Sequence, residues 1–432
     1  MTRSMKATRC VHLSAAVITI SVTSRPVNIV VASIEPVLTA SLILLFWSAF
    51  AVLCYSYAGY PVLVYLASKF CPPQQRYIAP QAQPSLPRVT VLIVAYNAEQ
   101  HIHGRINNIL ACDYPADRIE VLVASDGSTD ATVRIVEAFQ RPQVRALAFF
   151  HRRGKSKTLV DAVRHIESDI ILFTDATNRF DGQAIRHLAR HFADPHVGIV
   201  TGKVALIDER GDPMESLYWN MEMMTRRSEM RLGIMLGANG PIYAIRRELF
   251  VAPKCPVIND DFVLPILTHL RHQCGIVYDE TAKAYMLSSG GLLSEFRRRC
   301  RIGAGAYQSL SVLRELFQRR HLKQAAAFIS HKLMRWMGPF LLVVLLSSSV
   351  YLAALPAYRL LLWGQAAAYL IAVIGLFVPN RGHAPRLARV AASFLVLNLA
   401  LLAGFFRWLG QPQNVVWNPT VRPVLGGTNS PV

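Results

Sequence analysis

The chain has 432 residues, of which 52% are hydrophobic and 17% are charged, and its mean hydropathy is +0.29. This composition excludes an ordinary soluble enzyme and predicts membrane-spanning segments around a globular part. The formal net charge of +19 would suit a nucleic-acid-binding protein. However, the basic residues lie beside the apolar segments, so we expect no nucleic-acid partner. Seven scattered cysteines without a CxxC pair predict neither a disulfide framework nor a zinc site.

The N-terminal part predicts an extension, a membrane helix and a linker. Residues 1–34 form the extension, whose basic start and short apolar stretch leave a signal peptide open. Residues 35–68 hold the first apolar run, 37–57, which is long enough to cross a bilayer. Gly59-Tyr60-Pro61 predicts a kink near one membrane interface. Residues 69–87, rich in proline and glutamine, are expected to be a linker.

Residues 88–290 predict a globular α/β domain. Strand patterns at 89–95, 119–124, 144–150 and 170–174 alternate with helical patterns at 99–111, 129–139, 156–166 and 182–192. Such alternation is typical of a mostly parallel sheet that is covered on both faces. After 197–206 the pattern changes to a helix at 214–231, a glycine-rich segment at 233–245, a helix at 260–270 and a strand at 275–278. We expect this second half to hold an acceptor site.

The C-terminal part predicts further contact with the membrane. Residues 291–333 combine apolar side chains with clustered arginines and predict an amphipathic interfacial segment, although an ordinary surface helix stays open. Residues 334–409 contain three further apolar runs, 338–355, 360–378 and 390–406, before a tail at 410–432. Basic residues beside these runs predict a cytoplasmic globular domain by the positive-inside rule. The number of true spans and the side of the C-terminus stay open.

Acidic residues follow several apolar runs. Asp126 ends the second strand pattern, Asp175 follows the fourth, and Asp260-Asp261 begin a helical pattern. Because ligands of open α/β sheets bind beyond the carboxyl ends of the strands, we expect these carboxylates to converge on one crevice. Lys155 follows a basic, glycine-containing turn at the start of a helix, which suits phosphate oxygens, while a solvated turn is the alternative.

Five motifs occur in order along the chain. They are Ile-Val-Ala-Tyr-Asn-Ala-Glu at 93–99, Asp-Gly-Ser-Thr-Asp at 126–130, Gly-Lys at 154–155, Asp-Ala-Thr at 175–177 and Asp-Asp at 260–261. Together they resemble glycosyltransferase family 2 over about residues 88–305. With its apolar flanks, the chain is similar to membrane-embedded polysaccharide synthases of the cellulose and hyaluronan synthase kind. The resemblance implies a GT-A fold, a UDP-sugar donor, Mg²⁺ or Mn²⁺, and inversion at the anomeric carbon.

The resemblance also implies roles for individual residues. The donor-binding residues would be Tyr96, Asn97, Glu99, Asp126, Lys155, Arg298 and Arg301. Among these, Asp126 at its strand end can accept hydrogen bonds from a uracil, and the alternative for its motif is a plain strand-turn-helix connector. Asp175 would bind the metal, but Thr177 stands where the family has a second acid, which leaves metal dependence open.

The reacting groups are expected on the second half of the domain. Asp261, with Asp260 beside it, matches the acid that removes the proton of the acceptor hydroxyl, while helix capping at Asn259 is the structural alternative. Gly237 and Asn239 are expected on the acceptor side, unless their segment is a simple hairpin turn. Arg298 and Arg301 occupy two places of the processive Q-x-x-R-W motif, whose tryptophan is replaced by Ile302, so processivity stays open.

The predicted function is transfer of a sugar from a UDP-sugar, with inversion, to a glycan or lipid-linked acceptor at the cytoplasmic face of the cell membrane. Cell-surface polysaccharide synthesis is the expected setting, with membrane lipids and polysaccharide export proteins as partners. An inactive sugar-binding or scaffold subunit is the non-enzymatic alternative, favoured by the missing second acid. A nucleotidyltransferase is disfavoured because no glycine-rich loop follows the first strand. The donor sugar, the acceptor and the linkage stay open.

Overall fold

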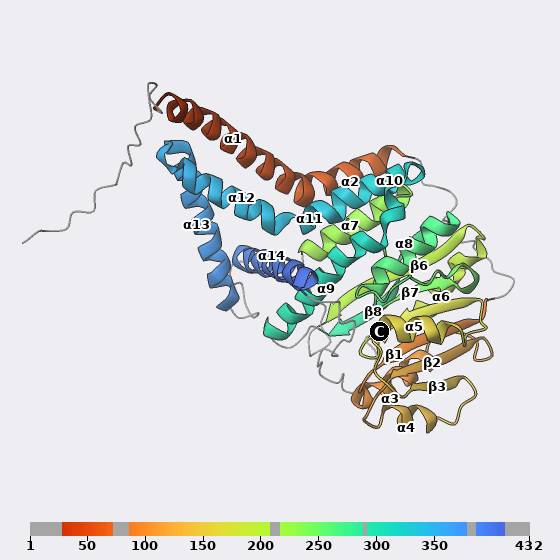
Figure 1. Ribbon diagram of the computed structural model, residues 1–432. Coiled ribbons are helices and arrows are strands. Elements are labelled where there is room, and N and C mark those ends of the chain that lie inside the picture. Colours follow the sequence, from red (N-terminus) through yellow and green to blue (C-terminus); the bar gives the residue numbers. More distant parts are fainter. Residues whose placement is uncertain (1–27, 72–85, 208–216, 288–291, 378–385, 411–432) are drawn as a thin grey trace, which may run out of the picture.

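The computed structural model describes residues 28–71, 86–207, 217–287, 292–377 and 386–410. An α/β domain occupies one end of the molecule, and long helices extend from it at the other end (Figure 1). Most of the predicted extension, linker and C-terminal tail lies outside the described residues. The boundaries proposed for those three segments therefore stay predictions.

The domain is built on one eight-stranded sheet with the order β3-β2-β1-β4-β7-β6-β8-β5. The strands are β1 (Val89–Ala95), β2 (Ile119–Asp126), β3 (Val144–Phe149), β4 (Ile170–Thr174), β5 (Arg179–Phe180), β6 (Val197–Ile207), β7 (Tyr243–Arg246) and β8 (Gly275–Leu287). The first four in the order are parallel, and β6 is parallel to β8, whereas β7 and β5 run antiparallel to their neighbours. The predicted α/β class and mostly parallel sheet are confirmed.

Helices cover both faces of this sheet. They are α3 (Glu99–Leu110), α4 (Thr132–Glu137), α5 (Lys155–Val163), α6 (Ala184–Ala189), α7 (Leu217–Arg231) and α8 (Asp260–His272), with short 3-10 turns η3 (Arg190–Ala193) and η4 (Arg247–Leu249). Side chains of β1 alternate between the two faces: Val91 and Ile93 share a core with α3, and Leu92 and Val94 share the other core with α5. Each is at most 3% exposed, and burial of such a side chain contributes about 1.5–3 kcal/mol.

A strand and a helix of the domain have bounds that differ from the prediction. The strand expected to end at 278 continues to Leu287, because Lys283 to Leu287 pair with Lys203 to Ile207 beyond an irregularity in the register. Polar residues in the middle of β8 conceal this pairing in the sequence. The helix expected from 129 begins instead at Thr132, whose backbone N–H donates to the Asp130 carboxylate.

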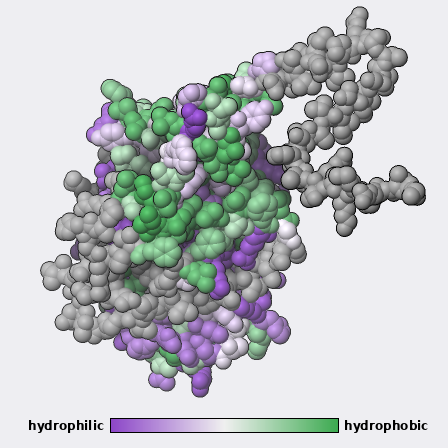
Figure 2. Space-filling view, turned by 90° about the vertical axis from the view of Figure 1, so that its left-hand side faces the viewer, coloured by the Kyte–Doolittle hydropathy of each residue, from purple (hydrophilic) through white to green (hydrophobic). Residues whose placement is uncertain are grey.

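The four predicted apolar runs form long helices and the short helical elements beside them. They are α1 (Asn28–Cys54), the π-helical turn η1 (Tyr55–Gly59), α2 (Tyr60–Phe70), α12 (Gly338–Tyr351), η8 (Leu352–Ala354), α13 (Pro356–Phe377) and α14 (Arg386–Gly410). Within the described ranges, three helices are long and apolar enough to cross a membrane, or four if the bent pair 319–336 and 338–354 is one span. Hydrophobic surface gathers over this end of the molecule, and hydrophilic surface over the sheet domain (Figure 2).

Between the domain and the last helices lies α9 (Leu292–Val312), followed by η5 (Arg314–Phe317), η6 (Arg319–His321), α10 (Leu322–Phe328), η7 (Ile329–Leu333) and α11 (Met334–Trp336). The predicted interfacial segment 291–333 is therefore one long helix, α9, followed by several short elements. The α9 helix packs along α14, and a Cβ on Gly404 would lie 2.8 Å from backbone atoms of Cys300 and Ala304. This close packing connects the domain directly to a candidate membrane span.

Candidate active site

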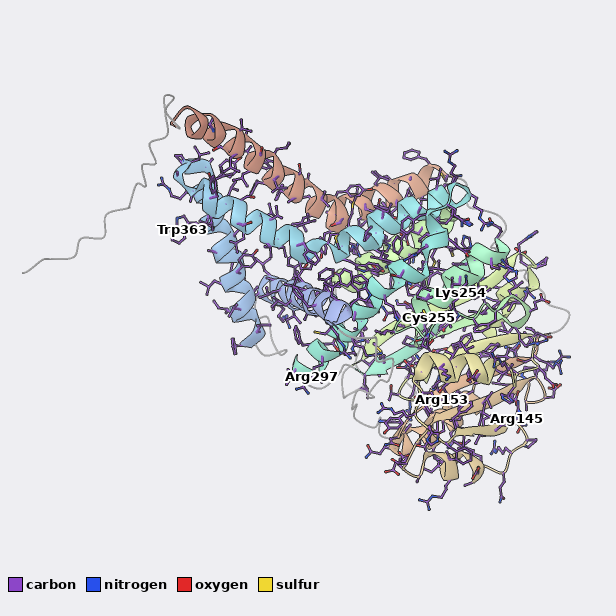
Figure 3. All side chains as sticks on the ribbon, in the orientation of Figure 1. Arg145, Arg153, Lys254, Cys255, Arg297 and Trp363 are labelled. Carbon is purple, nitrogen blue, oxygen red and sulfur yellow. The ribbon has the colours of Figure 1, made fainter. Side chains whose placement is uncertain are left out.

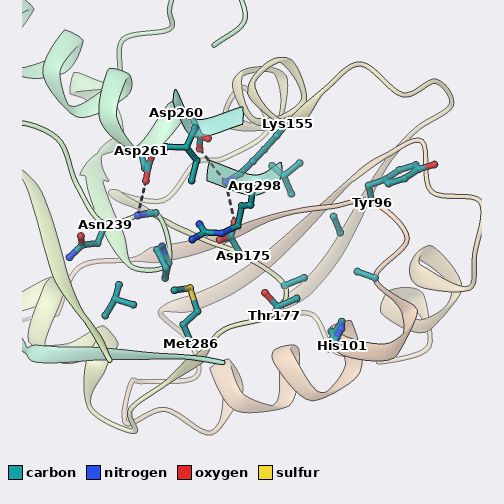
Figure 4. Close-up of a pocket in the computed structure, with 18 of the residues that line it drawn as sticks. Tyr96, His101, Lys155, Asp175, Thr177, Asn239, Asp260, Asp261, Met286 and Arg298 are labelled. Carbon is teal, nitrogen blue, oxygen red and sulfur yellow. Dashed lines mark hydrogen bonds and ion pairs between the residues drawn. The ribbon is translucent and has the colours of Figure 1, made fainter. Parts of the chain in front are cut away.

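A cavity of about 700 Å³ opens beyond the carboxyl ends of β1 and β4. Tyr96, Asn97 and Glu99 line it from the loop after β1, and Asp260 and Asp261 line it from the start of α8. Figure 4 shows Tyr96 on one side of the cavity and Asp260 and Asp261 on the other. The strand-end crevice predicted from the sequence is therefore present.

Lys155 joins two of the predicted acidic groups inside this cavity. Its Nζ lies 3.0 Å from Asp175 Oδ1 and 3.4 Å from Asp260 Oδ2, so one ammonium bridges β4 and α8 (Figure 4). Burial disfavours the charged ammonium, but the carboxylates of Asp175, Asp260 and Asp261 together raise the pKa of Lys155 above its usual value. The lysine is therefore a fixed positive charge in the cavity.

The Asp261 carboxylate also lines this cavity. Its Oδ2 accepts a hydrogen bond from the backbone N–H of Gly240 at 3.1 Å. Burial and the adjacent Asp260 raise the pKa of Asp261 to about 6, while Lys155 opposes that rise. A carboxylate with this pKa is ionised near neutral pH and is a stronger base than an ordinary aspartate.

Helix capping does not account for the two acids on α8. Asn259 precedes the helix but makes no side-chain cap hydrogen bond, and its Nδ2 donates instead to the carbonyl of Ile302 on α9 at 3.0 Å. Asp260 and Asp261 lie in the first turn, where the helix dipole favours negative charge. The start of α8 is thus a rigid support for two cavity-facing carboxylates.

Asp126 has surroundings that differ from the prediction. It is 0% exposed, and its carboxylate accepts hydrogen bonds from the backbone N–H groups of Arg153 (2.8 Å) and Gly154 (3.0 Å) and from Thr158 Oγ1 (2.7 Å). It therefore has no exposed surface with which to contact a nucleobase. We correct its expected role: Asp126 anchors the turn that presents Lys155.

The loop after β1 is fixed to the loop after β2. The backbone N–H of Thr129 donates to Asn97 Oδ1 at 2.9 Å, and Glu99 accepts from the backbone of Ala131 at 3.0 Å. The guanidinium of Arg152 lies 3.7 Å from the centre of the Tyr96 ring. Tyr96, Asn97 and Glu99 all line the cavity, and the last two also hold the loops together.

The predicted arginines of α9 both reach the cavity. The guanidinium of Arg298 donates twice to the Glu295 carboxylate, at 2.9 and 2.8 Å, so much of its charge is compensated. Burial lowers the pKa of the Arg301 guanidinium, and the charge of Asp260 opposes that shift. Arg301 is therefore within electrostatic reach of an acid of α8.

Of the two predicted acceptor-side residues, Asn239 and Gly237, only Asn239 lines the cavity. The Nδ2 of Asn239 donates to the carbonyl of Gly202 at 2.6 Å. Gly237 has φ +78°, and a Cβ there would lie 2.7 Å from the Phe262 ring, so its role is in packing. Gly240 takes its place beside Asn239 in the lining.

A divalent metal would find one protein carboxylate here. Asp175 and Thr177 line the cavity at the end of β4, and oxygen ligands suit Mg²⁺ and Mn²⁺. Across the described ranges, no group of three His, Cys, Asp or Glu side chains is arranged to hold a metal ion. The residues fit such an ion only if a bound diphosphate and water complete its coordination.

Two arginines at or near the cavity, one buried and one half-buried, were not predicted. Arg105 on α3 is 2% exposed and donates to Thr174 Oγ1 at 2.9 Å, directly before Asp175. Burial lowers its pKa to about 9, and the Asp175 carboxylate opposes this shift. Arg226 on α7 lines the cavity itself. The only sequence indication for Arg105 is that it interrupts the apolar face formed by Ile102, Ile106 and Ile109.

Comparison with known families agrees with this geometry. Residues 90–251 match the family model described as Glycosyl transferase family 2. This segment is a family 2 glycosyltransferase domain. The glycosyltransferase domain contains the β1 loop, Lys155, Asp175 and Asn239, while the acids of α8 and the arginines of α9 follow it along the chain.

Relatives and solved structures extend the likeness. The chain is 30% identical over 131 residues to a beta-monoglucosyldiacylglycerol synthase of Synechocystis sp., covering 28% of this chain and 26% of that one. It is 25% identical over 213 residues to an N-acetylglucosaminyltransferase of Rhizobium sp., covering 46% and 47%. The chain thus spans between about a quarter and a half of these relatives' lengths.

The mannosyltransferase PcManGT of Pyrobaculum calidifontis, solved with GDP-Man and Mn²⁺, matches 85% of this chain and 99% of its own. The TM-score is 0.62 and the sequence identity 22%, which supports a shared fold. Together with the family match, this likeness confirms the GT-A fold implied by the sequence.

Proposed function

We propose that the protein is an inverting glycosyltransferase that moves a sugar from a UDP-sugar to a hydroxyl of a glycan or lipid-linked acceptor. One observation carries the proposal: a single cavity is lined by Asp261, whose carboxylate accepts one backbone hydrogen bond, and by the ammonium of Lys155, which is held by Asp175 and Asp260. Direct displacement requires both a base for the acceptor and positive charge for the leaving group.

The proposed reaction is a single displacement. The acceptor hydroxyl gives its proton to Asp261 while its oxygen bonds to the anomeric carbon. The bond from that carbon to the diphosphate breaks, and its electrons go to the phosphate oxygen. Lys155 and Arg301 supply positive charge for this oxygen, and Asp260 holds Lys155 in place. A metal ion held by Asp175 and the diphosphate would add further stabilisation of the leaving group.

The donor proposed here is a UDP-sugar, and N-acetylglucosamine is the first sugar to test. Two kinds of relative support this order: the Rhizobium protein named above and the poly(ribitol-phosphate) beta-N-acetylglucosaminyltransferase TarS of Staphylococcus aureus, which is 25% identical over 128 residues. UDP release by the purified protein in liposomes is measured with UDP-GlcNAc, UDP-glucose, UDP-galactose and GDP-mannose. Release from GDP-mannose alone would overturn the choice of UDP.

The glycosyltransferase domain is proposed to face the cytoplasm, in the setting of cell-surface polysaccharide synthesis. Basic residues such as Arg297 lie on the α9 side of the molecule, whereas α13 carries exposed apolar side chains such as Trp363, which is 69% exposed (Figure 3). Cys255 is an exposed thiol of the domain. A variant that retains only this cysteine should react with a membrane-impermeant maleimide in inside-out vesicles. Reaction only in right-side-out vesicles would contradict the proposed orientation.

A further inference from the structure

A buried charge cluster joins α7 to the membrane-side helices. Glu222 and Glu229 are 6% and 3% exposed. The His331 ring places Nδ1 2.7 Å from Glu229 Oε1 and Nε2 3.1 Å from Glu222 Oε2. Lys332 Nζ and Arg335 Nη1 also donate to Glu222, at 3.1 and 3.0 Å. These contacts hold α7 against η7 and α11.

Arg226 is the member of this cluster that reaches the cavity. It lines the cavity with Asn239, Gly240 and Asp261, and its side chain is 15% exposed. Its Nε donates to Glu222 Oε1 at 3.3 Å. Its Nη1 is buried and has no hydrogen-bond partner among the residues that the structure describes. The cluster therefore does not saturate the hydrogen-bond donors of this guanidinium.

The cluster contains more positive than negative charge. Two carboxylates, Glu222 and Glu229, face three basic side chains, Lys332, Arg335 and Arg226. Because Glu222 already accepts from Lys332, Arg335 and His331, its long contact to Arg226 compensates only part of that guanidinium charge. The remaining positive charge of Arg226 lies at the cavity, where Asp261 is a further carboxylate.

The position of Arg226 favours the acceptor side over the donor side. It lies on α7, which packs against β8, and Asp261 lies at the start of α8, which packs against β6 and β8. Lys155 begins α5, which packs against β1 and β2 in the other half of the sheet. An acceptor whose hydroxyl approaches Asp261 would therefore bring its neighbouring groups to Arg226.

We infer that Arg226 forms an acceptor subsite for an anionic oxygen, a carboxylate or phosphate carried by the acceptor near its attacking hydroxyl. This inference rests on the proposed function, because it takes Asp261 to be the base. A guanidinium suits both anions, since it can donate two parallel hydrogen bonds to either. Glu222 and the groups behind it orient the guanidinium toward the cavity.

The test compares matched acceptors with wild type and variants. Octyl β-glucuronide, octyl β-glucoside 6-phosphate and neutral octyl β-glucoside are offered with the active donor. Wild type should use an anionic acceptor with a KM about tenfold or more lower than the neutral one, the effect of one charge-assisted hydrogen bond. The glucuronide and phosphate arms distinguish the two sources of the anion.

Arg226→Gln should lose this preference with the KM for the donor unchanged, and Arg226→Lys should retain part of it. Arg227→Gln is the matched control, because Arg227 lies one residue further on α7, is 58% exposed and pairs with Glu280 at the surface. Equal behaviour of the 226 and 227 variants, or equal use of neutral and anionic acceptors by wild type, would overturn the inference. A change in donor KM alone would place Arg226 on the donor instead.

Two further measurements keep the result decisive. Donor hydrolysis without any acceptor reports the proposed function separately, so its absence in wild type would count against the function rather than the subsite. If none of the three octyl acceptors is glycosylated, their binding to UDP-loaded protein is measured by calorimetry. Binding of the glucuronide and the phosphate no tighter than that of the neutral glucoside would then overturn the inference.

Discussion

Two aspartates of the domain, at the end of β2 and at the start of α8, have opposite surroundings. Asp126 at the end of β2 accepts hydrogen bonds from two backbone N–H groups and a hydroxyl, and it has no exposed surface. Asp261 at the start of α8 is half-buried, accepts one backbone hydrogen bond, from Gly240, and lines the cavity. Exposure and the number of donors together separate the structural carboxylate from the one that can react.

The largest expected effect is at Asp261. Asp261→Asn should lower the rate of transfer by about 10³-fold, within the range for loss of a general base, while UDP binds with unchanged affinity. UDP release and calorimetry on the same preparation measure the two quantities. Asp117→Asn, at an aspartate whose side chain is 79% exposed, is the control. An active, correctly inserted Asp261 variant would remove this residue as the base.

A smaller loss of activity is expected at Lys155, which follows the turn held by Asp126 and contacts Asp175 and Asp260. Lys155→Met should reduce kcat by about 10²-fold, since a positive charge at the leaving group is lost, and should also weaken UDP binding. Lys157→Met, two residues further on α5 and exposed, should leave both unchanged. Equal kinetics for the two lysine variants would mean that Lys155 only pairs with Asp175 and Asp260 in the ligand-free protein and takes no part in transfer.

At Asp126 the expected effect is on folding first. Asp126→Ala leaves two buried N–H groups unsatisfied and should lower stability by about 3 kcal/mol, read as a lower melting temperature in detergent. UDP affinity should fall as a consequence, because the turn that carries Lys155 is no longer anchored. An unchanged melting temperature together with lost UDP affinity would instead support direct contact between Asp126 and the nucleotide.

The pH dependence of kcat/KM provides a further comparison. Asp261 must be ionised to accept a proton, and its pKa is raised to about 6. The rate should therefore be constant above about pH 7 and fall about tenfold per pH unit below pH 6. A limb near pH 4, the ordinary range of an aspartate, would show that the cavity does not perturb this carboxyl.

The smallest effect concerns stability alone. Asp279 on β8 pairs with Arg190 and His191, each at 2.8 Å, and side-chain and backbone hydrogen bonds outweigh burial and lower its pKa. A lowered pKa stabilises the fold above the unfolded value near pH 4, and this contribution is lost as pH falls through the folded value. Asp279→Asn should lower the melting temperature at pH 7 by a few degrees without changing transfer. Equal melting temperatures at pH 7 would contradict this role.

The sequence predicted the strand ends, because apolar runs of strand length mark β1, β2 and β4 without help from tertiary structure. It also predicted that Asp175, Asp260 and Asp261 share one crevice, and the resemblance to family 2 glycosyltransferases added Lys155. It could not predict that Asp126 turns inward, since that depends on the backbone of a turn 27 residues later. Arg226 was missed for the same reason, because its position depends on packing between α7 and residues more than 100 positions away.

The proposed roles of Asp261, Lys155 and Arg301 are tested most directly by a structure of the Asp261→Asn protein with its UDP-sugar bound. We expect the diphosphate to lie against Lys155 and Arg301, with the anomeric carbon facing the start of α8. A donor bound elsewhere, or one whose anomeric carbon faces away from residue 261, would contradict these roles.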